Sequence, residues 1–219
     1  MIELKAKGRV FELPTHYGEL TLEKFLGFES HAGDLGELVS YLCDAPFKLR
    51  VEPEHFALIG YLFKPLSLDD FPPAEIFDIK RKTYGQKIEA HEALKADNTL
   101  KGLQRIVEIY YPETNVPAMR LDAVLPIYLS IVDQLTNILK VEQSTLHKAP
   151  TFEQTAAGIE EFEKLGYFSQ IDDLAGGDPL KYDAILQLEY SVVYYKLLKN
   201  KISATFTERY NAILKNSQQ

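Results

Sequence analysis

The chain has 219 residues, a formal net charge of −8 and a pI near 5.2. Its 46% hydrophobic and 26% charged residues are typical of a globular protein, and the acidic balance argues against nucleic-acid phosphates as its main partner. One cysteine, Cys43, excludes an intrachain disulfide and a thiolate metal cluster.

The amino terminus lacks the long apolar core of a signal peptide, and no apolar run reaches the roughly 20 residues of a membrane span. We therefore expect no membrane partner. Cys43 lies among leucines and valine, which predicts a small buried residue in a reducing compartment. The thirteen tyrosines and twelve phenylalanines supply aromatic groups for the core or for an interface.

The first residues predict a β-hairpin followed by a helix. Residues 2–6 and 9–13 alternate apolar and polar side chains around a tight turn at Lys7-Gly8, and Pro14 ends the second strand. Thr21 is placed to cap a helix that carries Leu22, Phe25 and Leu26. This order is the opening of a β-grasp-like unit.

The next segment predicts the remainder of an α+β domain that ends near residue 80. Asp34 caps a helix with Leu35, Leu38, Val39 and Leu42 on its inner face. Residues 48–51 predict a short strand and residues 53–63 a helix. Residues 75–79 predict a strand that joins the hairpin in a small mixed sheet. The domain prediction is 1–80.

Beyond residue 80 the pattern predicts only helices. Helices are expected over 84–96 and 100–111. Pro126 either kinks the longest helix or starts it, and we favour a start around 123–125, because proline is best tolerated in a first turn. Residues 81–219 are therefore predicted to be an all-helical domain. The fold class is α+β, predominantly α: a β-grasp-like hairpin-plus-helix unit followed by a helical bundle.

The last quarter predicts short helices with clear boundaries. Thr151 and Gln154 form a capping box for a helix with an apolar face of Phe152, Ala156, Ile159 and Phe162. A following helix carries Phe168, Ile171, Leu174 and Ala175 on one face. Gly176 and Gly177 end it, and Asp178-Pro179 starts the next helix as N-cap and first residue. These four residues are predicted to form a structural turn.

The final segment leaves two alternatives open. Tyr190, Val193, Tyr194, Leu197 and Leu198 share one face, but the apolar residues from Leu198 to Leu214 step by four, so each step rotates about 40°. Either the helix breaks near Asn200, with Thr205 and Glu208 capping a restart, or it exposes an apolar edge. Such an edge would be a docking surface for another chain.

No pattern of residues predicts a catalytic, cofactor or metal site. The five histidines are widely spaced, Gly-x-Ser-x-Gly and His-Glu-x-x-His are absent, and Gly176-Gly177-Asp178 lacks the lysine of a phosphate loop. The paired acids Asp69-Asp70 and Asp172-Asp173 point in diverging directions on a helix or turn. We expect a protein that is not an enzyme.

Three motifs resemble bacteriophage proteins encoded among tail genes. These are Leu174-Ala175-Gly176-Gly177-Asp178 with the Ile185-Leu186 helix behind it, the opening Leu13-Pro14-Thr15 with its Thr21-Leu22 helix, and Thr83-Tyr84-Gly85-Gln86-Lys87-Ile88. Together they cover about a third of the chain. The resemblance implies tail morphogenesis, most closely the role of a tail assembly chaperone.

The first hypothesis is a non-enzymatic factor that shields apolar stretches of another tail or virion protein, for example the tape-measure chain, in the cytoplasm of the infected bacterium. The second is a structural component of the virion in the neck, baseplate or capsid. The third is a small acidic enzyme or a host-directed inhibitor. A homo-oligomer is also possible. The residues expected to bind the partner are Tyr190, Tyr194, Leu197, Phe206 and Tyr210.

Overall fold

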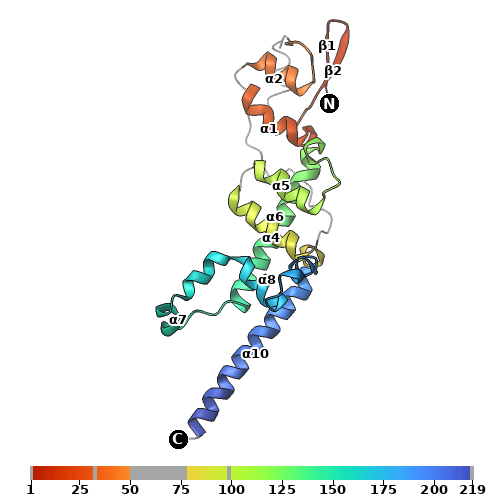
Figure 1. The fold of residues 1–219 in the computed structure, drawn as a ribbon. Coiled ribbons are helices and arrows are strands. Elements are labelled where there is room, and N and C mark those ends of the chain that lie inside the picture. The colour runs from red at the N-terminus through yellow and green to blue at the C-terminus, as the bar shows by residue number, and fades with distance from the viewer. Residues whose placement is uncertain (1, 32–33, 50–77, 98–99, 218–219) are drawn as a thin grey trace. The chain divides into compact units, whose positions relative to one another are not determined.

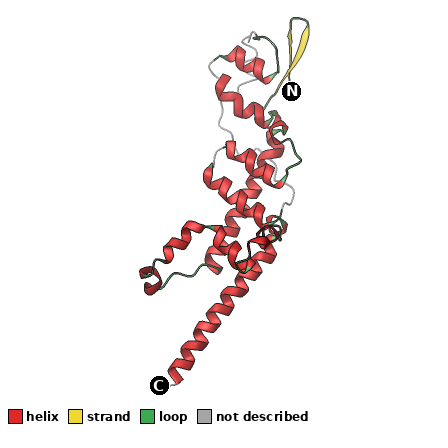
Figure 2. Ribbon diagram, viewed as in Figure 1, coloured by secondary structure: helices red, strands yellow, loops and turns green. Residues whose placement is uncertain are grey.

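A computed structural model describes residues 2–31, 34–49, 78–97 and 100–217. The protein is 72% helical with one small antiparallel hairpin at its N-terminus (Figures 1 and 2), which confirms the predicted fold class. Among the described residues the sheet has two strands.

The hairpin forms over the predicted strands and turn. Strand β1 (Ile2–Ala6) pairs antiparallel with β2 (Arg9–Leu13), from Ile2 opposite Leu13 to Ala6 opposite Arg9. Lys7 and Gly8 both have positive φ, 48° and 72°, as a two-residue hairpin turn requires. Leu4, Phe11 and Leu13 are buried, so one face of the hairpin packs on the core.

Two compact units are defined by contacts between Cα atoms. The first contains residues 1–77 and 93–131, and the second contains residues 78–92 and 132–219. The second unit starts close to the predicted boundary at residue 80, but residues 93–131 group with the first unit rather than with the helical domain. That 1–80 and 81–219 are separate domains stays a prediction.

In the first unit, α1 (Leu22–His31) and α2 (Leu35–Leu42) begin at the predicted caps. Lys24 N donates to Thr21 Oγ1 at 3.3 Å, and the Asp34 carboxylate accepts from the amides of Gly36 and Glu37. The unit also contains η1 (Tyr17–Glu19), α5 (Leu100–Tyr110) and η5 (Val116–Ala118). Leu38, Val39 and Leu42 are buried as expected.

Two predicted strands need correction. Lys48 and Leu49 have no regular secondary structure. The Leu49 amide donates to Ser40 Oγ at 2.6 Å rather than to the carbonyl of a neighbouring strand. Asp78 is the N-cap of a 3₁₀ turn, η4 (Ile79–Arg81), so the end of the expected 75–79 strand is helical. Residues 50–51, the helix predicted at 53–63 and residues 75–77 lie outside the described residues.

Helix α4 (Tyr84–Ala96) has its predicted bounds, whereas α6 (Leu121–Thr145) starts earlier than predicted. Pro126 lies inside α6 because the first turn is already anchored: Leu121 N donates to Leu20 O, and Val124 N donates to Arg120 O. Pro126 then removes only one N–H from the helix. Its apolar side forms core: Leu121, Val124, Leu125, Ile131, Leu135 and Ile138.

The second unit ends in short helices and one long one. These are α7 (Phe152–Ala156), η6 (Ile159–Leu165), α8 (Tyr167–Ala175), η7 (Pro179–Lys181), α9 (Tyr182–Leu186) and α10 (Tyr190–Ser217). The predicted capping box of α7 is present. The prediction of one helix with an apolar face from Phe152 to Phe162 is wrong, because α7 has only five residues and Phe152 is 83% exposed.

Helix α10 is continuous over 28 residues, so of the two alternatives the break near Asn200 does not occur (Figure 1). Its start is fixed to the residues before α4 by two backbone hydrogen bonds of 2.8 Å, Tyr84 N to Leu188 O and Tyr190 N to Lys82 O. The predicted apolar edge is therefore the alternative that the fold adopts.

Candidate functional site

The glycine turn before η7 is structural, as predicted. Gly176 ends α8 in the left-handed conformation with φ of 69°. The amides of Gly176 and Gly177 donate to the last carbonyls of α8, on Asp173 and Asp172. Asp178 Oδ1 then accepts from Leu180 N at 3.1 Å and Pro179 opens η7. The turn thus satisfies its own backbone groups.

The base of α10 encloses a buried lysine that the sequence pattern does not reveal. Lys87 on α4 has no exposed side-chain surface, and its Nζ donates to both carboxylate oxygens of Glu142 on α6 at 3.0 and 2.8 Å. Nζ also donates to the Tyr167 hydroxyl at 3.2 Å and lies over the rings of Tyr167 and Tyr190. Of the four apolar residues spaced along α4, Ala90 and Ala93 are buried, whereas Ile88 and Leu94 are only half-buried.

Hydroxyl groups complete this buried cluster. The Tyr167 hydroxyl lies 2.5 Å from His91 Nδ1, and Tyr84 donates to Gln170 Oε1 at 2.8 Å. Burial is the main cause that raises the pKa of Tyr84, Tyr167 and Tyr190, and the Glu142 carboxylate raises all three further. These tyrosines are therefore neutral at physiological pH and act as hydrogen-bonding core residues.

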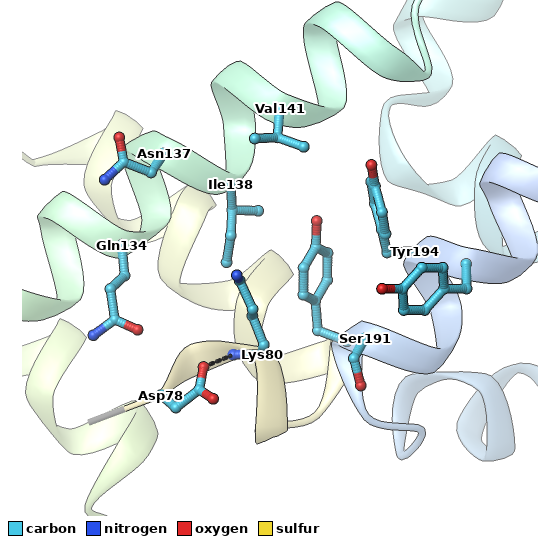
Figure 3. A pocket seen from close by; sticks show the side chains of 10 residues that line it. Asp78, Lys80, Gln134, Asn137, Ile138, Val141, Ser191 and Tyr194 are labelled. Carbon is cyan, nitrogen blue, oxygen red and sulfur yellow. Dashed lines mark hydrogen bonds between the residues drawn. The ribbon is translucent and has the colours of Figure 1, made fainter. Parts of the chain in front are cut away.

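A pocket of about 370 Å³ lies between η4, α6 and the first turns of α10 (Figure 3). Helix α6 supplies Gln134, Asn137, Ile138 and Val141; η4 and its cap supply Asp78 and Lys80; α10 supplies Tyr190, Ser191, Tyr194 and Tyr195. Most of this wall is apolar, so the pocket suits an apolar side chain better than a polar substrate.

One side of α10 packs on the other elements of the second unit. Tyr190 and Val193 are buried, and the Tyr194 hydroxyl lies 3.2 Å from Thr145 Oγ1. Farther along, Lys201 Nζ donates to the carbonyls of Thr145 and His147, and Lys148 pairs with Glu208 at 2.6 Å. These contacts fix which face of α10 is turned inward.

The other side of α10 presents a seam of exposed residues at heptad spacing. We call Val192, Tyr195, Lys199, Ile202, Phe206, Arg209 and Ile213 the α10 seam. Steps alternating between three and four residues keep this set within an arc of about 100°. Its apolar members are 52–68% exposed. Lys201 and Glu208 point roughly 130–150° away from the centre of this arc, so the seam faces outward, and Tyr195 near its start also borders the pocket.

The five predicted partner-binding residues divide between the two sides of α10. Tyr190 is buried, and Tyr194 and Leu197 are half-buried. Phe206 and Tyr210 are 67% and 52% exposed, and their rings stack with centroids 6.0 Å apart. Phe206 belongs to the α10 seam and Tyr210 flanks it. Val192, Tyr195, Ile202 and Ile213 were missed, although their heptad spacing with Phe206 was available as a signal.

Charge also distinguishes α10 from the rest of the chain. The helix carries five basic residues and one acid, Glu208, whereas the whole chain has a net charge of −8. Lys199 and Arg209 lie within the seam and form no ion pair with any residue that the structure describes. The outward face is thus both apolar and positively charged.

Three other features of the chain do not indicate a functional site. Cys43 is buried as predicted, and burial raises the pKa of its thiol to about 11, which leaves it unreactive. Across the described ranges, no three His, Cys, Asp or Glu side chains are grouped as a metal site needs. Helix α6 is long and apolar enough to cross a membrane by length and composition alone. Core helices pass the same test, so the absence of a membrane partner stays a prediction.

Comparisons with protein-family models, with curated proteins and with solved structures found no significant match to this chain.

Proposed function

We propose that this protein is a non-enzymatic bacteriophage tail morphogenesis factor that binds another tail protein through the α10 seam. The observation that carries the binding role is the exposure of the seam. Every residue from Ile202 to Ser217 is exposed except Thr205, and four large apolar side chains of this stretch lie on or beside one narrow face: Ile202, Phe206, Tyr210 and Ile213.

An uncovered helix of this kind favours association. A stretch of about 16 residues with little tertiary packing is marginally stable in water, because packing of an amphipathic face supplies most helical stability in proteins. Covering a large apolar side chain contributes about 1.5–3 kcal/mol. A partner that covers the seam would therefore stabilise the helix and gain affinity from the same contacts.

The phage assignment rests on the sequence resemblance and on its three motifs. It places the protein in the cytoplasm of the infected bacterium, where a tail assembly chaperone would shield apolar stretches of the tape-measure chain or of another tail protein. The alternative, a structural component in the neck, baseplate or capsid, would use the same seam for a permanent contact. Mass spectrometry of purified virions separates them, since a chaperone is missing from finished particles.

The binding role is tested by co-expression with the tail proteins of the same phage, the tape-measure chain first. We expect a complex with one of them that the double variant Phe206→Ser, Ile213→Ser abolishes. The matched control is Ala204→Ser, Ala212→Ser, which makes two serine substitutions on other faces of the same exposed helix. No complex with any tail protein, or equal loss in the control, would overturn the proposal.

A further inference from the structure

We propose that the α10 seam binds a helix of a different protein that carries acidic side chains opposite Lys199 and Arg209. This inference rests on the proposed function and specifies the chemistry of its partner. It follows from the spacing of the seam, from the charges within it and from the face of α10 on which it lies.

The spacing of the seam indicates a helical partner. Val192, Lys199, Phe206 and Ile213 occupy one heptad position, and Tyr195, Ile202 and Arg209 occupy the other. This arrangement forms the knobs and holes that a second helix fills. The seam covers about three heptads, or about 32 Å of helix, which sets the length of the matching partner segment.

The charges indicate an acidic partner. Lys199 and Arg209 interrupt an otherwise apolar seam, and both would be partly removed from water when a helix covers it. Burying a charge is costly unless it is paired. Glutamate or aspartate at the two facing positions compensates this cost, and the remaining facing positions need apolar side chains.

The same charges disfavour a second copy of this chain. In a parallel pair Lys199 faces Lys199 and Arg209 faces Arg209. In a fully overlapped antiparallel pair, with Val192 opposite Ile213, Lys199 faces Phe206 and Arg209 faces Tyr195. The parallel pair brings like charges together, and the antiparallel pair covers both charges with no acid opposite them, so both arrangements act against self-association.

Two synthetic peptides test the inference with the full-length chain. Each has about three heptads with leucine at its core positions. The first has glutamate at two core positions spaced as Lys199 and Arg209 are, and the second has lysine there. The same spacing places both glutamates opposite Lys199 and Arg209 whether the peptide binds parallel or antiparallel to α10. By fluorescence anisotropy we expect the glutamate peptide to bind at least about tenfold more tightly, with an advantage that shrinks as salt is raised.

Charge reversal supplies the decisive control. The double variant Lys199→Glu, Arg209→Glu should prefer the lysine peptide, and because both sites are exposed the variant should fold normally, which circular dichroism checks. Equal affinity for the two peptides, or no change of preference in the variant, would overturn the inference. A dimer in analytical ultracentrifugation that Phe206→Glu dissociates would overturn it too, because the seam would then be occupied by a second copy.

Failure of this inference and failure of the proposed function give different results. If a tail protein binds through the seam while the peptides show no charge preference, only the acidic partner is wrong. If the peptides discriminate but no tail protein binds, the chemistry of the seam stands and its assignment to tail assembly is wrong.

Discussion

At the scale of single residues, the central observation is a lysine in the core that is fully compensated. Lys87 has two carboxylate oxygens, a hydroxyl oxygen and two aromatic rings around its ammonium. Lys87 lies on α4 and these partners come from α6, α8 and α10, so this single side chain links four helices of the second unit.

We predict that Lys87→Met destabilises the protein by about 3–5 kcal/mol, because it leaves the Glu142 carboxylate without its cation. The free energy of unfolding from urea denaturation measures this loss. The double variant Lys87→Met, Glu142→Met removes both charges and should be more stable than the single variant. Losses that simply add would contradict the account of Lys87 as a paired ion.

At the scale of elements, local sequence signals set the helix boundaries while tertiary contacts modify them. Thr21, Asp34, Thr151 and Asp178 all cap where expected. The start of α6 does not follow its proline, because contacts from Leu20 hold the preceding turn. Caps are local and could be predicted, whereas an anchor about a hundred residues away in sequence could not.

We predict that Gly176→Ala destabilises the protein by about 1–2 kcal/mol, because a Cβ disfavours the left-handed conformation at this position. No atom within 4 Å of the new Cβ would clash, so the cost comes from the backbone alone. Gly176→Asn is the matched variant and should lose less, since asparagine tolerates this conformation. Urea denaturation of both variants provides the measurement, and equal losses would contradict the explanation.

At the scale of the whole molecule, the apolar surface is unevenly distributed. Exposed apolar groups gather along α10 on a helix of positive charge, while the chain overall is acidic. A contiguous exposed patch of this kind marks an interaction site.

We predict that the unbound protein binds the dye ANS at the α10 seam. Ile202→Ser combined with Phe206→Ser and Ile213→Ser should abolish most of the fluorescence increase while the thermal midpoint changes by no more than about 2 °C, since the three side chains contribute little to the core. Persisting fluorescence with an unchanged midpoint would place the dye elsewhere. A large fall in the midpoint would show that the seam is packed in the folded protein.

The sequence revealed the fold class better than it revealed the site. Alternation in the hairpin and helical spacing in α5 were strong local signals, whereas the apolar residues of α10 left both a broken and a continuous helix open. The outward face was harder, because steps of four from Leu198 to Leu214 mix residues of two faces. Only the inward contacts of Lys201 and Glu208 separate them. Lys87 was missed because a buried charge has the same local pattern as an exposed one.

The amine of Lys201 has one further consequence. It seals the carbonyl groups at the C-terminal end of α6, where the helix dipole favours a cation. Acetylation of this single amine would remove its charge and weaken the contact between α10 and the end of α6. The position of α10 would then change without any modification of its outward side chains.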